Sequence, residues 1–389
     1  MTLRELAEKA ETYIIELLEG RCRSHRDRVA LGCLFALSQL YRGIVQLRHH
    51  LYKERLIRQR MLGCMVVSIG NLTTGGTGKT PVVEVFARTL AAKGRRVAIL
   101  SRGYRSKSQP LWRKVRDRFT RRDRETPPKI VSDGRRLLLD SATAGDEPYM
   151  LASNLPETIV LVDKDRVKAG RYAIRRFGAD TLILDDGFQY LPLRPHFNIL
   201  LVDATNPFHN HHLLPRGLLR EPLKHLRRAN VVFLTKSDGS HRLDHLKKFI
   251  NKHNPRAEII ECTHKPEYLQ DVYARQRFPL ETLRGKRVAA ISGIAVPEGF
   301  EVFLGKLGAE LVYAERFADH HRFRQQEVIN FINTATARGA ELAVTTEKDA
   351  VRFPMLERRD LPVQFLRVHI DILSGHESFN DCITRLCFL

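Results

Sequence analysis

Hydrophobic and polar positions alternate along this chain in the pattern of an α/β protein. Short apolar runs that end in polar residues recur, with helical stretches between them. The first predicted strands are Met65–Ile69, Val97–Ser101, Thr158–Val162, Thr181–Leu184, Asn198–Val202 and Asn230–Leu234. A second set is Arg287–Ser292, Glu310–Tyr313, Glu341–Thr345 and Val363–Val368. The alternation predicts a parallel, helix-covered sheet with ligands at the carboxyl ends of its strands. Between the two sets, residues 251–286 are mixed in character and are interpreted as a linker.

The N-terminal segment carries its own pattern. Met1 to Gly20 is mixed and is not a secretory signal. The apolar run 30–37 is limited by Arg28, Gln39 and Arg42 to less than the ~20 residues of a membrane span. From Leu40 onward, apolar residues at helical spacing lie among many arginines, which predicts a basic amphipathic helix in a membrane interface. An ordinary helix packed on the domain fits this segment equally well.

Composition narrows the choice of partners. The 389 residues are 43% hydrophobic, as in globular proteins, but carry a formal charge of +21. Such a charge favours a polyanionic partner, which could be nucleic acid, an acidic membrane face or a phosphorylated substrate. The six cysteines include no C-x-x-C pair and are interpreted as reduced thiols. Residues 105–129, which include the only tryptophan, Trp112, are interpreted as a basic surface excursion.

A glycine-rich loop follows the first predicted strand and precedes a helical run. It consists of Thr73, Thr74, Gly75, Gly76, Thr77, Gly78, Lys79 and Thr80. Strand–loop–helix context makes such a loop a phosphate site, because its backbone N–H groups and the helix N-terminus face the phosphate oxygens. Lys79 would reach the β- and γ-phosphates and Thr80 would bind Mg²⁺. Thr73 stands where the usual P-loop pattern has its first glycine.

Two carboxylates, Asp185 and Asp186, end the predicted strand that begins at Thr181. In a P-loop protein such a strand commonly lies beside the loop, so its terminal Asp can order Mg²⁺. A turn cap beside Gly187 is the alternative. The pattern does not decide which Asp faces the metal, because adjacent strand residues point to opposite faces.

Two further motifs have a structural and a chemical interpretation. Asp146, in Gly145-Asp146-Glu147-Pro148, is either an ordinary helix start or a general base for phosphoryl transfer. The run Asp319-His320-His321 is a weak zinc signal, a polar loop, or the source of an imidazole that orients a carboxylate.

These motifs, in order with Ser101–Tyr104, Val131–Gly134, Leu214–Pro222, Ser292–Ile294 and Thr345–Asp349, resemble the tetraacyldisaccharide 4'-kinase family, the lipid A 4'-kinases. The resemblance covers about Leu40 to Val368, and Thr73 belongs to the family's own pattern. Two features depart from it: Tyr190 stands where the family often has His, and the basic segment 105–129 is longer.

The resemblance implies a P-loop NTPase-like parallel sheet core, a smaller α/β domain and an N-terminal membrane-associated helix. The expected boundaries are 1–60 for the helical segment, 61–250 for the kinase core and 251–389 for the smaller domain that closes a cleft. The last helix of the smaller domain could return to the core. The implied reaction transfers the γ-phosphate of ATP, with Mg²⁺, to the 4'-hydroxyl of a tetraacyl glucosamine disaccharide 1-phosphate at the cytoplasmic face of the inner membrane.

Matched residue by residue, the resemblance makes Lys79, Asp146 and His320 catalytic, with Asp146 as base and His320 as its orienting partner. Residues 73–80 bind ATP, and Thr80, Asp185 and Asp186 bind the metal. Contacts to phosphate or substrate are assigned to Arg102, Tyr104, Arg220 and Glu221. The expected partners are the lipid A precursor and an anionic membrane surface, without nucleic acid, for a monomeric enzyme. The alternative is a P-loop switch or metal-chaperone NTPase without a lipid substrate.

Overall fold

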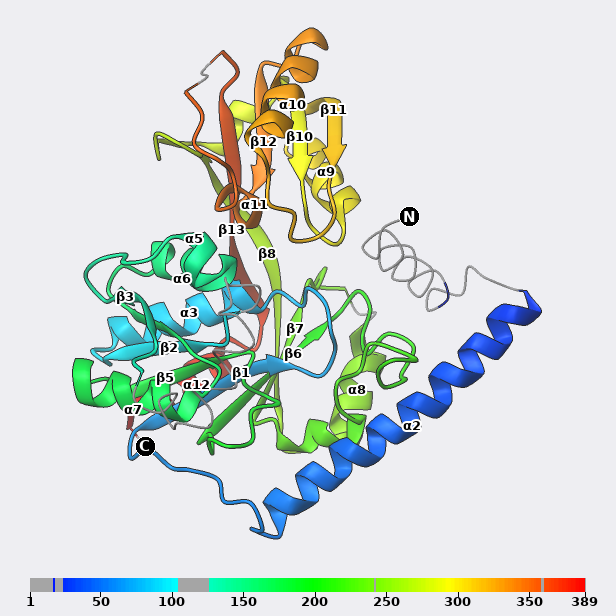
Figure 1. Ribbon diagram of the computed structural model, residues 1–389, viewed down its shortest axis with the longest axis vertical. Helices are drawn as coiled ribbons and strands as arrows, with labels where there is room; N and C mark the ends of the chain where they lie inside the picture. Colours follow the sequence, from blue (N-terminus) through cyan, green and yellow to red (C-terminus); the bar gives the residue numbers. More distant parts are fainter. Residues whose placement is uncertain (1–16, 18–23, 104–125, 241–242, 358–359, 389) are drawn as a thin grey trace.

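The computed structural model describes residues 17, 24–103, 126–240, 243–357 and 360–388. Thirteen strands of these residues form one sheet, in the order β11-β10-β12-β13-β8-β7-β6-β1-β5-β2-β4-β3, with β9 beside β8. Figure 1 shows two lobes stacked along the long axis of the molecule and joined by β8 and β13. We call the lobe that contains β1 to β7 the P-loop half and the lobe that contains β10 to β12 the second half.

The P-loop half is built on parallel strands that are covered on both faces. Its strands are β1 (Met65–Asn71), β2 (Val97–Ser101), β3 (Lys129–Asp133), β4 (Ile159–Val162), β5 (Thr181–Asp185), β6 (Phe197–Asp203) and β7 (Val231–Thr235). Every residue of β1, β2, β5 and β7 is buried, which explains their nearly continuous apolar sequences. Only β3 runs antiparallel to its neighbour in this half of the described sheet.

Helices cover both faces of this half. One face carries α3 (Lys79–Ala92) and α6 (Asp146–Asn154), and the other carries α7 (Arg166–Phe177). Smaller elements complete it, namely α5 (Ser141–Ala144), α8 (Asp244–His253) and the 3-10 helix η2 (Leu223–Arg228). The helices hold the sheet rigid and leave the carboxyl ends of β1, β5 and β7 to carry the loops of a site.

The second half repeats the same layered plan on a smaller scale. Its strands are β9 (Arg277–Phe278), β10 (Arg287–Ser292), β11 (Glu310–Arg316) and β12 (Leu342–Thr346). Two hydrophobic clusters lie on the two faces of these strands, one under α9 (Pro297–Lys306) and one under α10 (Gln325–Ala337). The short elements are η4 (Leu280–Leu283) and α11 (Glu347–Ala350).

An antiparallel ribbon of two long strands joins the halves. It pairs β8 (Glu258–Asp271) with β13 (Val363–Ser374). The interpretation of residues 251–286 as a linker was therefore wrong, because their central part is a strand that runs through both lobes. After β13, α12 (His376–Phe388) packs against α3, with the Phe379 ring 5.3 Å from that of Phe86. The chain thus ends in the P-loop half.

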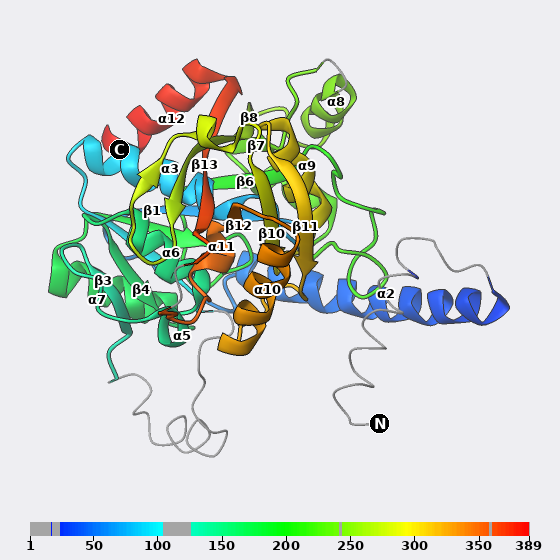
Figure 2. The same cartoon turned by 90° about the horizontal axis from the view of Figure 1, so that it is seen from above.

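The helix α2 (His25–Lys53) is one continuous element of 29 residues. Ser24 and Asp27 form a capping box at its start, each side chain bonding the other's backbone N–H. Among the described residues it is the one helix long and apolar enough to cross a membrane by length and composition. The sequence argument had ended the apolar stretch too early, since Arg42 is the only charged residue between Ala30 and Leu47. Figure 2 shows α2 projecting well beyond the rest of the fold.

All ten predicted strands are present, most of them within a residue or two of their expected bounds. The parallel, helix-covered sheet is confirmed. Besides β8, the strands β3 and β9 had not been predicted. Tyr104 and Trp112, with most of the basic segment 105–129, lie outside the described residues.

Candidate active site

The phosphate-binding loop lies between β1 and α3, as its sequence predicts. Gly78 adopts a left-handed conformation with φ of 73°, which favours glycine, and α3 begins at the next residue, Lys79. The side chain of Thr77 is buried and accepts a hydrogen bond of 2.9 Å from Asn71 Nδ2. Its carbonyl accepts another, also 2.9 Å, from Thr235 Oγ1 at the end of β7. The ends of two strands, β1 and β7, therefore fix the shape of the loop.

The segment 218–220 lies along the entrance to this loop. Thr74 N donates to Leu218 O at 2.8 Å, and Arg220 N donates to Leu72 O at 2.7 Å. These backbone bonds bring the Arg220 side chain to the same edge of the sheet. There, Arg220 Nη1 donates to both carboxylate oxygens of Asp186, at 2.9 and 2.7 Å.

Asp185 and Asp186 lie beside the loop because β5 pairs with β1, with Asp185 opposite Ile69. Asp185 is buried and accepts a 3.0 Å hydrogen bond from Ser101 Oγ at the end of β2. Burial, together with the charges of Glu147 and Asp186, raises the pKa of Asp185 to about 6. Burial also acts on Asp186, but Lys79 and Arg220 outweigh it and hold its pKa below the ordinary value. We call residues 73–80 with Asp185 and Asp186 the P-loop cluster.

The P-loop cluster suits Mg²⁺. Its side chains offer hydroxyl and carboxylate oxygens, the ligands that this cation prefers. The pKa of Asp185 is raised because its carboxylate is buried and is repelled by the neighbouring carboxylates. A divalent cation bound there would offset this repulsion. The side chains of Thr80, Asp185 and Asp186 are the ones that would hold it.

A second group of polar side chains gathers where the two halves meet. Asp146, in the first turn of α6, accepts hydrogen bonds from Arg322 Nη2 at 3.0 Å and from Arg352 Nε at 2.8 Å. His320 Nδ1 lies 3.7 Å from Asp146 Oδ2, an ion-pair separation. Burial raises the pKa of Asp146, but His320 and the two guanidiniums outweigh it and lower that pKa. We call Asp146, His320, Arg322 and Arg352 the Asp146 cluster.

The His320 imidazole has cationic donors at both nitrogens. Arg352 Nη2 lies 3.0 Å from Nδ1, and Lys348 Nζ lies 3.1 Å from Nε2. A neutral imidazole accepts at one nitrogen only, so one of these contacts cannot be a hydrogen bond. When Lys348 donates to Nε2, Nδ1 carries the proton and faces Asp146, which is the tautomer that would orient this carboxylate.

The start of α6 joins the two clusters. Asp146 belongs to the Asp146 cluster, while the charge of the next residue, Glu147, is felt at Asp185 in the P-loop cluster. Sequence reasoning had singled out Asp146 and overlooked Glu147, although the two acids stand together in the motif. It also missed Arg322 and Arg352, because isolated arginines carry no sequence signal in so basic a chain.

The four residues predicted to contact phosphate or substrate do not lie together. Arg220 lies on Asp186, as described, and Arg102 is exposed after β2, near enough for its charge to act on Arg166. Glu221 is buried and turns toward His49 and His225, so the structure does not bring its carboxylate to the P-loop. Tyr104 is outside the described residues.

A P-loop with carboxylates at the end of the neighbouring strand, facing a carboxylate–imidazole pair, defines a P-loop phosphotransferase. The model of the family described as LpxK, tetraacyldisaccharide-1-P 4'-kinase, matches residues 31–387. The chain therefore belongs to this family. It is an ATP-dependent kinase, and the family's acceptor is an alcohol of the lipid A precursor.

Individual relatives agree with this assignment. A tetraacyldisaccharide 4'-kinase of Halothermothrix orenii is 35% identical over 359 residues, covering 90% of this chain and 89% of the relative. One from Anaeromyxobacter dehalogenans is 45% identical over 314 residues, covering 80% and 78%. The crystal structure of LpxK from Aquifex aeolicus in complex with ATP, 29% identical, superposes with a TM-score of 0.70 and covers 92% of this chain and all of that one.

Proposed function

We propose that this kinase transfers the γ-phosphate of ATP to the 4'-hydroxyl of a tetraacyl glucosamine disaccharide 1-phosphate at the cytoplasmic face of the inner membrane, acting as a monomer. The observation that carries the proposal is the position of two adjacent acidic residues at the start of α6. There the charge of Glu147 acts on Asp185 of the P-loop cluster, and the adjacent Asp146 lies 3.7 Å from His320. A phosphate held by the P-loop and a hydroxyl held by Asp146 would therefore meet at one helix end.

The P-loop cluster would hold the nucleotide. The backbone N–H groups of Gly75, Gly76, Gly78 and Lys79 and the Lys79 ammonium bind the phosphates, and the N-terminus of α3 adds its dipole. Thr80, Asp185 and Asp186 hold Mg²⁺, which when bound neutralises charge on the phosphate oxygens. Arg220 keeps Asp186 ionised and fixed.

Asp146 would take the proton of the sugar hydroxyl. Its lowered pKa keeps the carboxylate ionised at neutral pH, so it can accept a proton late in the transfer, when the hydroxyl has become acidic. Arg352 is fully buried and holds Oδ2, whereas Arg322 is 46% exposed and holds Oδ1. The incoming hydroxyl therefore displaces Arg322 from Oδ1, while Arg352 and His320 keep the carboxylate oriented.

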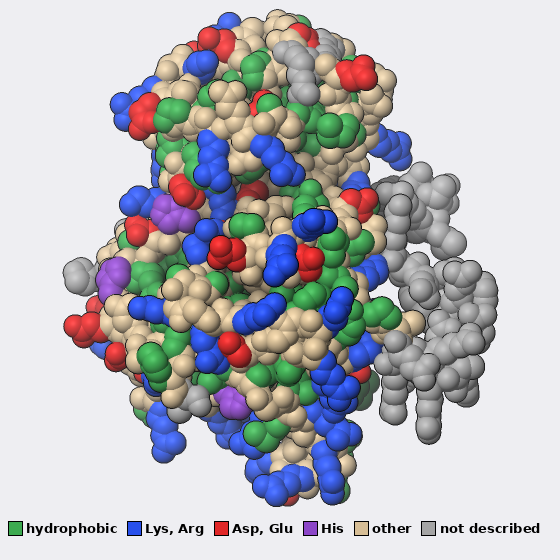
Figure 3. Space-filling view, turned by 90° about the vertical axis from the view of Figure 1, so that its left-hand side faces the viewer, with side chains coloured by type: hydrophobic (Ala, Val, Ile, Leu, Met, Phe, Trp, Pro, Cys, Tyr) green, Lys and Arg blue, Asp and Glu red, His purple; other side chains and the backbone are tan. Residues whose placement is uncertain are grey.

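The helix α2 would bring this site to the membrane. One side of its C-terminal half contacts the core, through Tyr41, Arg48 and His49. A stripe that flanks this side is exposed and apolar, comprising Val29, Leu37, Leu40, Ile44 and Leu47. Because its C-terminal half is docked, we place α2 in the interface, with its exposed stripe in lipid. Basic side chains gather at the end of the molecule where α2 ends (Figure 3), which suits an anionic membrane and a phosphorylated lipid.

The test is incubation of the full chain, in detergent micelles with Mg²⁺, with γ-labelled ATP and a lipid A disaccharide 1-phosphate acceptor. Label is scored in the lipid phase. Asp146→Ala is expected to lower lipid labelling by about 10²–10⁴-fold, because the general base is lost. His320→Ala is expected to lower it less, because the carboxylate remains but is no longer oriented. Both variants keep the affinity of the wild type for ATP.

The matched control is His321→Gln. His321 neighbours His320 but bonds Glu327, at 2.8 Å, and its replacement leaves the Asp146 cluster intact. Near-wild-type labelling by both Asp146→Ala and His320→Ala would contradict the assigned roles. ATP hydrolysis without any labelled lipid would instead favour a P-loop switch or metal-chaperone NTPase.

A further inference from the structure

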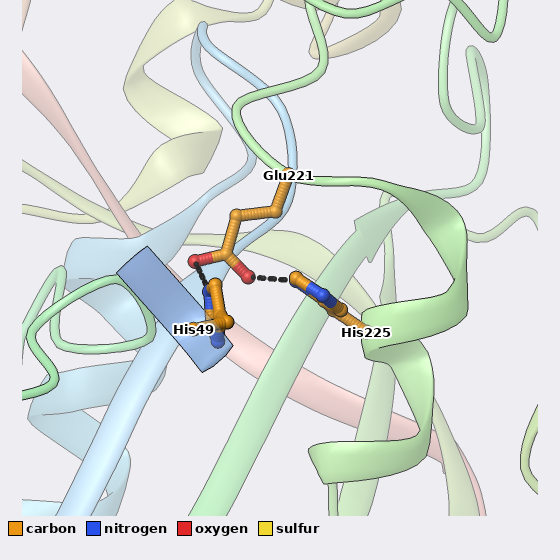
Figure 4. Close-up of side chains that lie close together, drawn as sticks. All are labelled: His49, Glu221 and His225. Carbon is orange, nitrogen blue, oxygen red and sulfur yellow. Dashed lines mark hydrogen bonds and ion pairs between the residues drawn. The ribbon is translucent and has the colours of Figure 1, made fainter. Parts of the chain in front are cut away.

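A buried carboxylate ties α2 to the P-loop half. Glu221 Oε1 lies 3.2 Å from His49 Nε2 on α2, and Oε2 lies 2.7 Å from His225 Nδ1 on η2 (Figure 4). Arg228 Nη2 also donates to Oε2, at 2.6 Å. Burial raises the pKa of Glu221, but the hydrogen bonds from His225 and His49 and the charge of Arg228 lower it to about 2. The carboxylate is therefore ionised and receives three donors.

His49, Glu221 and His225 could also be interpreted as a metal site, since their ligand atoms lie within 4.8 Å of one another. Arg228 argues against this. Its guanidinium occupies Oε2, donates to Phe188 O at 3.0 Å and lies over the Phe188 ring, 4.1 Å from the centroid. A cation bound by Glu221 would face this fixed positive charge, so hydrogen bonds explain the cluster better than a metal does.

Two more contacts from the same face of α2 reach neighbouring backbone. Tyr41 Oη donates to Arg220 O at 2.9 Å, and Arg48 Nη2 donates to Gln189 O at 3.2 Å. Positions 48 and 49 lie about two helical turns after position 41, and the three share one side of the helix. The side chains of α2 thus hold the chain at 220–221 and at 189.

The segment 220–221 and residue Gln189 are both hydrogen-bonded to the P-loop cluster or to the strand end before it. Arg220 bonds Asp186 through its side chain and Leu72 through its backbone. Gln189 Nε2 donates to Asn71 O at 2.8 Å, at the end of β1. A path therefore leads from His49 to Asp186: a hydrogen bond from His49 to Glu221, the peptide bond between Glu221 and Arg220, and the hydrogen bonds from Arg220 to Asp186.

We propose that His49 and His225 are positioning residues that act through Glu221 on Arg220, so that the seating of α2 sets the geometry of the nucleotide site. With α2 docked, Glu221 is held, and Arg220 is kept on Asp186 and along the loop entrance. When α2 shifts, Glu221 loses a donor and Arg220 moves with it. The inference rests on the proposed metal role of Asp186 but not on the identity of the lipid.

The experiment measures the dissociation constant for Mg²⁺–ATP, by displacement of a fluorescent ATP analogue from the full chain in detergent micelles. His49→Ala is expected to raise this constant roughly tenfold, because one donor of a charge-assisted network is lost. His49→Gln retains an N–H donor and is expected to restore most of the affinity. His50→Ala is the matched control, since the neighbouring imidazole is 62% exposed and lies 3.9 Å from the exposed carboxylate of Glu54.

A lower thermal midpoint for His49→Ala with unchanged affinity for Mg²⁺–ATP would overturn the proposal, because His49 would then be merely structural. Stoichiometric Zn²⁺ binding that disappears in His49→Ala would also overturn it, in favour of a metal centre. If His49→Ala does not fold, Tyr41→Phe removes only the bond to Arg220 O, and its expected effect has the same sign. A wild type that binds Mg²⁺–ATP but labels no lipid would contradict the proposed function and leave this inference standing.

Discussion

The P-loop cluster and the Asp146 cluster serve one reaction but are assembled in different ways. The P-loop cluster comes from adjacent strand ends of one sheet, with Asp185 paired in register to β1. The Asp146 cluster joins residues 176 and 206 positions apart, from the two halves of the molecule. The first is therefore set within the sheet of one half, whereas the second exists only when the halves are correctly placed. Changes in the two clusters should separate nucleotide binding from transfer.

The largest effect is expected when the P-loop cluster itself is broken. Lys79→Met removes the cation that faces the phosphates and the two Asp residues, so lipid labelling should fall by about 10³-fold or more and ATP should bind more weakly. Labelling and ATP affinity are measured together. Lys93→Met, at the far end of the same helix, is the control and should behave as the wild type. Retention of about a tenth of the activity by Lys79→Met would count against the assignment.

The link between the halves gives the next largest effect, on stability. Arg367 of β13 bonds Glu84 of α3 and Glu347 of α11, with 2.7 Å between Nη1 and Glu347 Oε1, and all three side chains are largely buried. Arg367→Met would take the guanidinium from the buried Glu347 and leave Glu84 paired with the exposed Arg88, at a cost of about 3–5 kcal/mol in the free energy of unfolding. Urea unfolding followed by circular dichroism measures this loss.

The control for Arg367 is Lys265→Met on the same ribbon. Lys265 pairs with Asp371 at 3.3 Å, both largely exposed, so its loss should cost about 1 kcal/mol or less. Equal losses in the two variants would mean that the buried network does not hold the halves together.

The smallest effect concerns the place where the ribbon touches the loop. His264 of β8 lies against Gly78, and burial together with the charge of Lys236 lowers its pKa to about 4. An unfolded chain binds this proton near pH ~6.5, so the contribution to stability is complete above that value and is lost as the pH falls toward 4. The thermal midpoint of the wild type should therefore fall, relative to His264→Gln, between pH 7 and pH 5, by about a few degrees at most. If the thermal midpoints of the two proteins changed equally with pH, this prediction would be wrong.

The sequence predicted the P-loop cluster and the parallel sheet because both follow from local pattern. Asn71 to Thr80 form a contiguous motif, and buried parallel strands are nearly continuous apolar runs. It did not predict β8, because only residues 260–262 and Leu269 of this strand are buried and the others, with Pro266 and several charges, are half-buried or exposed. It could not reveal Arg322, Arg352 or Glu147, since their importance arises from contacts between distant segments.

The ribbon of β8 and β13 has a mechanical consequence. The chain enters the second half on β8 and returns from it on the antiparallel neighbour β13, so a hydrogen-bonded pair of strands connects the lobes. Such a pair resists shear along its length but twists readily, and its register shifts between Arg367 and Val368. A relative motion of the lobes would therefore be a twist of this strand pair rather than a hinge motion. Because His320 and Arg352 belong to the second half and Asp146 to the P-loop half, such a twist would change how these side chains meet.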